Sequence, residues 1–564
     1  MRRIVLALIV AGISIVVVRG TKAGGDDDDW GRFHFAPDSL VLTRSFYTGN
    51  ADTVKIGETL PPGCAGGPNG TTNVTVPTLT GSTTSVAVTC GVASDNGEFP
   101  NDRDSHNVWN NTNSDGSFGI TSPILLDNIS TDGWFLGTLP VPTGLMVTSF
   151  SSKSELALNL SVDGKSLSFM GYVGGPGCGD GRLSPTRPNL IDVSASSTPA
   201  VCDPTNPVIS SFVSNPAIPT AYYRGVAEVD ASGHISVTHG NAYSGDNGRA
   251  AIKGGNGLYY MVGNDNSGNL SKAQLPITQI GQELINATGA EMLMPGQLPP
   301  APPNIAMIGR LQIGKDKPGK DTNFRGLTIF DNTLYISKGS GGNGINTVYQ
   351  VGSAGVLPTG SATELAAVPI TPLPGFPNTT ASTSTSFPFG IWFANANTLY
   401  VCDEGDGTLV TGQTINGQTV VVDAQTLATA GLQKWVRQNG TWVMAYVLQN
   451  GLDLGVPYSV AHYQAFLNPA TGGCRNVTGR VNGDGTVTIW AITSTVSANG
   501  DQGADPNKLV KVSDVLSATS VPSGENGLGV FKTVRTARRR SLPGSLVRAE
   551  KRRPILSRVL HSEK

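Results

Sequence analysis

The sequence predicts an all-β fold, a single β-propeller of about seven four-stranded blades. Its composition favours short strands and turns, because the 564 residues include 71 Gly and 36 Pro and only 14% are charged. A second observation is a strand–turn–strand pattern that recurs along the chain. A third is a further short strand after each of these hairpins, which completes units of four strands in meander order.

The recurring hairpin is clearest at residues 247–268, 323–344 and 387–407. In the first two, Arg249 or Arg325 precedes a Leu-Tyr pair, and in the third Phe389 holds the same place. Each hairpin turns at Gly, Asn or Asp, which accept the positive φ of short hairpin turns. Units of roughly 65–80 residues give six to eight blades over such a chain. A row of separate β-sandwiches is the alternative, although no Pro/Ser-rich linker divides the body.

Residues 1–23 have the pattern of a signal peptide. Two arginines precede an apolar run from Ile4 to Val18, and small residues around Ala23 offer a cleavage site. The run is short for a membrane span. We therefore expect a secreted or extracellular protein. Arg19 and Lys22 leave open the alternative of a protein that is membrane-tethered by an uncleaved N-terminal anchor.

The mature chain divides into three parts by charge. Residues 24–30 form an acidic mature N-terminus, and residues 31–531 form the propeller. Residues 532–564 carry eleven Lys or Arg against two Glu, which predicts a basic, disordered tail able to touch acidic surfaces. The body is acidic, so no nucleic acid is expected as its partner, and we expect a monomer.

Six cysteines form an even set in a chain expected to reach an oxidising compartment, which favours disulfide bonds. We predict that near neighbours pair. The predicted disulfides are Cys64 with Cys90, Cys178 with Cys202, and Cys402 with Cys474. Asn-x-Ser/Thr sequons also occur, and they allow but do not establish glycosylation.

Three segments resemble an uncharacterised family of secreted proteins of β-propeller type. They are "SFSSKSELALNLSVDGKSLSFMGYVGG" (149–175), "RGVAEVDASG" (224–233) and "GLQKWVRQNGTW" (431–442). The resemblance covers most of residues 38–515 and implies the propeller fold and the extracellular compartment. It implies no catalytic residue, because the family has none assigned.

Propeller geometry predicts one candidate site. The inner strand of each blade begins at one mouth of the channel, and the loops after the second strands crown the same face. Arg249, Arg325 and Phe389 should therefore ring this mouth, with His462 at the possible start of another inner strand. The structural alternative is that each arginine pairs with an acid of the neighbouring blade and locks the two blades together.

The segment "CDEGDG" (402–407) is the densest acidic loop of the predicted crown. Asp403, Glu404 and Asp406 are candidate calcium ligands, because calcium prefers carboxylate and carbonyl oxygens. No other cofactor is expected, and the spacing is not that of an EF-hand. The related segment "NGDG" (482–485) lies between two strands and is predicted to be a hairpin turn.

Two functions are open. The first is a non-catalytic binding module for a carbohydrate, a peptide or a surface partner, with a polar or anionic extracellular ligand at the crown. The alternative is a secreted hydrolase or lyase that acts on an anionic polymer or ester with crown carboxylates and calcium. No G-x-S-x-G elbow or phosphate-binding loop occurs in the sequence, so the first interpretation is preferred.

Overall fold

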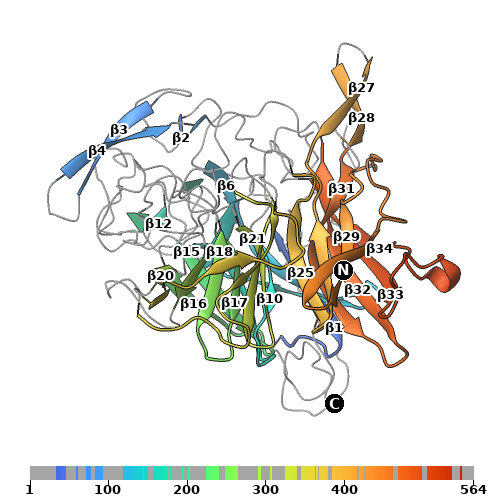
Figure 1. The fold of residues 1–564 in the computed structure, drawn as a ribbon. Helices are drawn as coiled ribbons and strands as arrows, with labels where there is room; N and C mark the ends of the chain where they lie inside the picture. Colours follow the sequence, from blue (N-terminus) through green and yellow to red (C-terminus); the bar gives the residue numbers. More distant parts are fainter. Residues whose placement is uncertain are drawn as a thin grey trace, which may run out of the picture.

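The computed structural model describes the strands and many of their turns (Figure 1). The described residues are 33–45, 59–60, 71–77, 83–89, 91–92, 118–143, 145–149, 156–173, 178–179, 193–195, 201–202, 224–240, 248–263, 290–293, 305–307, 324–339, 344–361, 364–365, 367–378, 384–415, 418–424, 427–460, 468–497, 505–536 and 546–548. Among them, no helix is long and apolar enough to cross a membrane.

The fold is all-β, and its sheets are arranged as a β-propeller. Within the described residues there are five four-stranded blades and a seven-stranded sheet, which we call the wide sheet. The prediction of seven four-stranded blades is therefore wrong. Its cause is the length of two connections, residues 46–123 and 174–223, each of which joins neighbouring strands of one sheet. The described strands of these two connections form two-stranded pairs or join the wide sheet, and none of them builds a further four-stranded blade.

Each four-stranded blade is named here by its order along the chain. The first contains β1 (Ser39–Ser45), β7 (Ile124–Ser130), β8 (Phe135–Pro140) and β35 (Leu546–Arg548). The second contains β17 (Gly248–Lys253), β18 (Tyr259–Gly263), β19 (Ala290–Leu293) and β20 (Ile305–Met307). The third contains β21 (Phe324–Phe330), β22 (Thr333–Lys338), β23 (Thr347–Val351) and β24 (Ile370–Pro372). The fourth contains β25 (Pro388–Asn395), β26 (Thr398–Asp403), β29 (Gly431–Gln438) and β30 (Thr441–Leu448). The fifth contains β31 (Ala470–Val481), β32 (Thr486–Val496), β33 (Lys508–Val515) and β34 (Lys532–Thr536).

The wide sheet and four small pairs make up the remaining strands. The wide sheet contains β6 (Phe118–Ser122), β9 (Met146–Ser149), β10 (Asn159–Leu160), β11 (Ser166–Val173), β13 (Val193–Ala195), β15 (Arg224–Asp230) and β16 (Ile235–Gly240). The small pairs are β2 (Thr59–Leu60) with β5 (Gly91–Val92), β3 (Thr71–Pro77) with β4 (Thr83–Thr89), β12 (Cys178–Gly179) with β14 (Val201–Cys202), and β27 (Leu409–Ile415) with β28 (Gln418–Ala424). A short 3-10 helix, η6, spans Glu525–Gly527.

The core lies between neighbouring sheets around the ring. One apolar cluster joins the first blade to the wide sheet and contains Val41 and Phe169. Further clusters join the wide sheet to the second blade and continue through to the fifth. The last cluster joins the fifth blade back to the first and contains Trp490 and Leu40, both fully buried. This closed series of interfaces is what defines the propeller.

The ring is closed by strands from both ends of the chain. In the first blade, β1 pairs with β35, so that Leu40 lies opposite Arg548 and Leu42 lies opposite Leu546. Strand β34 pairs with β33 in the fifth blade. Two strands therefore lie after residue 531, inside the segment expected to be a disordered tail. Residues 1–32, which include the predicted signal peptide and acidic N-terminus, lie outside the described residues.

The two ends of the propeller differ in their connections. We call the end at which β17, β21, β25 and β31 begin the crown end, and the opposite end the base end. At the base end, several hairpins close through short turns, including the turn at 230–233 and the predicted turn at 482–485, while residues 352–369 and 516–531 form longer connections there. At the crown end, the strands are joined by much longer segments, which contain the small β2–β5, β12–β14 and β27–β28 pairs (Figure 1).

Candidate functional site at the crown end

The inner strands of four blades share one irregularity near the crown end. The pairing of each with its second strand shifts register at a β-bulge, between Gly248 and Ala250, Phe324 and Leu327, Pro388 and Ile391, and Cys474 and Val477. A bulge leaves its extra residue outside the regular ladder and re-aims its side chain. The residues at these bulges are Arg249, Arg325, Phe389 and Arg475, and all four are buried.

Contacts link these four positions from one blade to the next. Arg249 Nη1 donates to the carbonyl oxygen of Phe324 at 3.1 Å. The guanidinium carbon of Arg475 lies 5.9 Å from the centroid of the Phe389 ring. Arg249 and Arg325 are thus at the same end of the molecule, as the sequence predicts. Their part in binding a ligand stays a prediction.

Glu404 is shared by two arginines from the blades on either side. Its Oε2 lies 3.0 Å from Nε of Arg475, and its Oε1 lies 3.8 Å from Nε of Arg325. The exposed fractions of the three side chains are 10% or less. Glu404 belongs to the fourth blade, whereas the arginines belong to the third and fifth. This geometry is that of an interblade lock, and it matches the structural alternative for Arg325, whereas the contact of Arg249 described above is to a backbone carbonyl.

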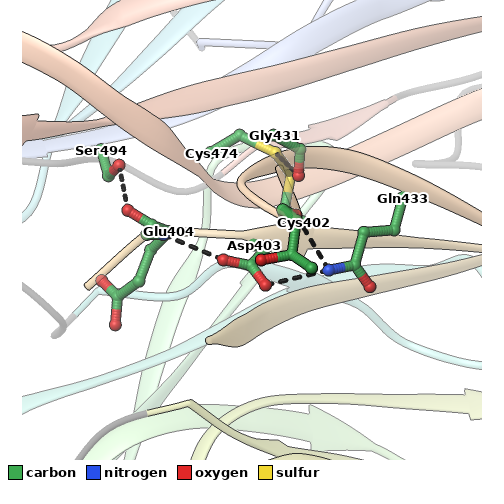
Figure 2. Close-up of a disulfide and its surroundings, with 9 residues drawn as sticks. Cys402, Asp403, Glu404, Gly431, Gln433, Cys474 and Ser494 are labelled. Carbon is green, nitrogen blue, oxygen red and sulfur yellow. Dashed lines mark hydrogen bonds between the residues drawn. A yellow bond between two sulfur atoms is a disulfide. The ribbon is translucent and has the colours of Figure 1, made fainter. Parts of the chain in front are cut away.

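Close backbone approach keeps this lock rigid. Ser494 Oγ donates to the carbonyl oxygen of Glu404 at 2.8 Å (Figure 2). The amide of Glu404 donates to the carbonyl oxygen of Phe387 at 3.0 Å. A Cβ atom at Gly390 would lie 2.3 Å from the carbonyl oxygen of Arg475, and one at Gly326 would lie 2.2 Å from that of Phe389. Only glycine permits the inner strands to pack this closely.

Asp403 is fully buried, and Figure 2 shows its hydrogen bond with Gln433. Its Oδ2 accepts hydrogen bonds from Gln433 Nε2 at 2.9 Å, the amide of Phe387 at 2.8 Å and Ser386 Oγ at 3.1 Å. Its Oδ1 accepts from the amide of Gly405 at 3.0 Å. Burial raises the pKa of the Asp403 carboxyl to about 7, although the donors from Phe387, Gly405 and Ser386 oppose that shift.

The predicted disulfide between Cys402 and Cys474 is confirmed (Figure 2). It joins the second strand of the fourth blade to the inner strand of the fifth, next to both Asp403 and Arg475. The backbone of β12 and β14 places Cys178 directly opposite Cys202, which suits the second predicted pair. That pair stays a prediction, and Cys64 and Cys90 lie outside the described residues.

The three candidate calcium ligands do not converge. Among the described residues, no three His, Cys, Asp or Glu side chains are grouped closely enough to hold a metal ion. Asp403 and Glu404 have the partners given above, and Asp406 Oδ1 accepts from the amide of Thr408 at 2.9 Å. Calcium binding stays a prediction without a described ligand set. His462 lies outside the described residues.

Two residues near this site, Arg475 and Tyr458, were missed by the sequence patterns. Arg475 precedes no Leu-Tyr pair, because its hairpin strands are longer than the others. The predicted Cys402–Cys474 bond was the available signal, since it brings the neighbours of both cysteines together. Tyr458 donates to the carbonyl oxygen of Pro506 at 2.5 Å, and burial together with Asp505 raises its pKa well above the usual value.

Comparisons with known proteins add distant structural likenesses. No family model and no curated protein matches the chain, so the resemblance to a secreted family gains no support from them. Among solved structures, a glucose dehydrogenase has 10% identity and a TM-score of 0.30, with 69% of this chain and 92% of that chain covered. A Trypanosoma rangeli sialidase in complex with the inhibitor DANA has 11% identity and a TM-score of 0.30, with 76% and 56% covered. The propeller assignment above rests on the sheets and their interfaces.

Proposed function

We propose that the protein is a secreted, non-catalytic binding module that receives a polar or anionic ligand at the crown end. The observation that carries the proposal is the unequal length of the connections at the two ends. Loops held by a rigid scaffold are where binding residues concentrate. The ligand class is a carbohydrate, a peptide or another surface component. The Cys402–Cys474 disulfide supports an oxidising compartment.

The β27–β28 hairpin is the best-supported recognition element. It projects beyond the body of the propeller at the crown end (Figure 1). The chain leaves for the hairpin through Gly405 and Gly407, both in the left-handed region with φ of 76° and 70°. It returns at Thr429, whose carbonyl oxygen accepts from Gln433 Nε2 at 2.9 Å.

The stem of this hairpin is fastened at both sides. Gln433 Nε2 also donates to Asp403, so one side chain joins the outgoing and returning segments. Gln449 Nε2 donates to the carbonyl oxygens of Leu427 and Ala430 at 2.9 and 2.7 Å. A fixed stem under a projecting hairpin reduces the ordering cost of binding. This pre-organisation favours recognition as the role of the hairpin.

The hydrolase or lyase alternative has less support. Paired catalytic carboxylates must reach the substrate. Asp403 is enclosed by four donors, and Glu404 is engaged by Arg325 and Arg475. Both carboxylates therefore have structural partners that account for their positions.

Glycan and peptide arrays probed with the purified protein test the proposal. Replacing residues 409–424 with a short Gly/Ser linker should abolish the array signal and leave thermal unfolding cooperative. The matched control replaces Gly524–Gly527 at the base end with the same linker and should keep the signal. Turnover of anionic polymers or esters, with or without calcium, would instead favour the enzyme. An unchanged array signal after removal of the hairpin would contradict the role given to it.

A further inference from the structure

Three consecutive apolar residues are exposed at the base end of the first blade. The exposed fractions are 77% for Trp134, 48% for Phe135 and 39% for Leu136. Single exposed apolar residues are ordinary on protein surfaces. Three adjacent exposed apolar residues that begin with a tryptophan are unusual, because contiguous exposed apolar surface marks an interaction site.

The turn that presents this run is held firmly. The amide of Trp134 donates to Ser130 Oγ at 3.0 Å, and its carbonyl oxygen accepts from the amide of Ser130 at 2.8 Å. Trp490 Nε1 of the fifth blade donates to the carbonyl oxygen of Thr131 at 3.0 Å. A Cβ atom at Gly133 would lie 2.5 Å from Cγ1 of Val534, so the turn packs tightly on β34. The exposure of Trp134 is therefore a property of a fixed structure.

Basic side chains flank the same surface. Lys511 Nζ lies 3.0 Å from Asp132 Oδ1, within the turn. The guanidinium carbon of Arg535 lies 5.4 Å from the centroid of the Phe135 ring. Both residues belong to outer strands of the fifth blade, which lie beside the first. Aromatic and cationic groups are thus presented together.

The ends of the chain emerge at this surface as well. Ser39 at the start of β1 pairs with Ser130, and Arg548 at the end of β35 pairs with Leu40. The chain before β1 includes the apolar run from Ile4 to Val18, which stays attached only in the membrane-tethered alternative. The chain after β35 carries five Lys or Arg, namely Lys551, Arg552, Arg553, Arg558 and Lys564, against two Glu. Both segments start from the end of the molecule that carries Trp134.

We propose that the base end docks on an anionic lipid surface. Tryptophan and phenylalanine favour the interface between headgroups and hydrocarbon, and basic residues are attracted to anionic headgroups. The two kinds of group together give firmer binding than either alone. Docking in this way directs the crown end away from the membrane. The inference is independent of the proposed function, because it concerns the opposite end of the propeller.

Hydrogen–deuterium exchange of the full chain gives a local test. The probe is a vesicle of phosphatidylserine and phosphatidylcholine in equal parts, compared with phosphatidylcholine alone. Amide exchange at residues 131–140 should slow several-fold with the anionic vesicles and much less with the neutral ones. Exchange in the β27–β28 hairpin at the crown end should not change. High salt should weaken the protection, because it screens the basic residues.

A substitution series tests the same surface by vesicle sedimentation. Trp134→Ser combined with Phe135→Ser should lower partitioning by about tenfold or more, because two interfacial aromatic side chains are removed. Val456→Ser changes an apolar residue that is 53% exposed at the crown end, and it should leave partitioning unchanged. Arg535→Gln should reduce binding to anionic vesicles by a smaller factor.

Three outcomes would overturn the proposal. Vesicle binding without protection at residues 131–140 would mean that the N-terminal apolar run inserts alone. Protection that rises with protein concentration in the absence of vesicles would mean that a second copy covers the β8 edge. Exchange at residues 131–140 that is as slow without vesicles as with them, at every protein concentration, would mean that this chain covers its own apolar surface.

Discussion

Two buried charge clusters join the fourth and fifth blades, one toward each end of the propeller. Toward the base end, Lys434 Nζ lies 3.3 Å from Asp514 Oδ2, and both side chains are fully buried. At the crown end, Glu404 of the fourth blade lies between Arg475 of the fifth and Arg325 of the third. The same pair of blades is thus held by charge at both ends, but in different ways.

The cluster toward the base end is a closed set. Lys434 Nζ donates to the carbonyl oxygens of Val515 and Ala518 at 2.6 and 3.0 Å, as well as to the hydroxyl of Tyr446 at 3.0 Å. Asp514 accepts from the hydroxyls of Tyr400 at 2.6 Å and Tyr446 at 2.7 Å. Burial lowers the pKa of Lys434, and burial together with Asp514 raises the pKa of both tyrosines. All of these partners belong to the fourth and fifth blades or to the connection that follows β33, so the role of the cluster is structural.

The crown cluster spans three blades and lies beside the stem of the β27–β28 hairpin. The lesson of the comparison is that buried side chains of opposite charge pair at both ends, although the residue types differ. What differs is the chain around it. Function is therefore expected to follow the length of the connections, and stability to follow the enclosed pairs.

The largest expected effect is at the base cluster. Lys434→Met should lower the free energy of unfolding by about 3–5 kcal/mol, because it leaves the buried Asp514 carboxylate without its cation. Urea denaturation measures this loss. Lys165→Met is the control, since its side chain is 68% exposed and its contact with Asp163 is 3.9 Å, and it should change stability by less than about 0.5 kcal/mol.

Ligand binding at the crown should survive Lys434→Met once the protein is folded. A loss of ligand affinity as large as that caused by removing the β27–β28 hairpin would break the comparison. It would show that the base cluster contributes to ligand binding as well as to stability.

An intermediate effect is expected at Asp403. Asp403→Asn should lower the free energy of unfolding at pH 7 by about 1–3 kcal/mol, because an amide nitrogen would face one of the backbone donors that the carboxylate accepts. The half-exposed Asp406 in the same loop supplies the control Asp406→Asn, which should have little effect. Equal losses for the two variants would contradict the partners assigned to Asp403.

The same residue predicts a dependence on pH. The pKa of Asp403 is raised in the folded protein to about 7 from a reference value of 3.8, so the folded state binds more protons between these values. The stabilisation is fully present below about pH 4 and is lost as pH rises through about 7. Unfolding measured across this window should show a negative slope that flattens in Asp403→Asn. A slope that is the same in the variant would assign it to other groups.

The smallest effect compares one glycine from each end. Gly485 at the base end and Gly407 at the crown end have φ of 81° and 70°, and a Cβ at either would meet no atom within 4 Å. Each substitution by alanine should cost about 1 kcal/mol from backbone strain alone. Thermal melting should show equal losses, whereas array binding should weaken only for Gly407→Ala. If array binding weakened equally in both variants, the assignment of ligand binding to the crown end would be wrong.

The sequence was informative where local chemistry decides structure. The Leu-Tyr hairpins, the turn at 482–485 and the Cys402–Cys474 bond all follow from turn residues, alternation and spacing. The number of blades did not follow, because a long connection within a sheet looks like further strands until its pairing is known. Arg475 was missed for a related reason, since register across blades depends on packing that no local pattern records.

Strand β35 also bears on how the protein is made. It supplies one strand of the first blade, yet it is synthesised after every other described strand. The blades in the middle of the chain can fold in order as they are synthesised, while the first blade waits beside them with an unpaired edge. Completion of the ring is thus a late event that requires the segment ending at residue 548. A protease that removed this segment would leave β1, in the first blade, with an unpaired edge.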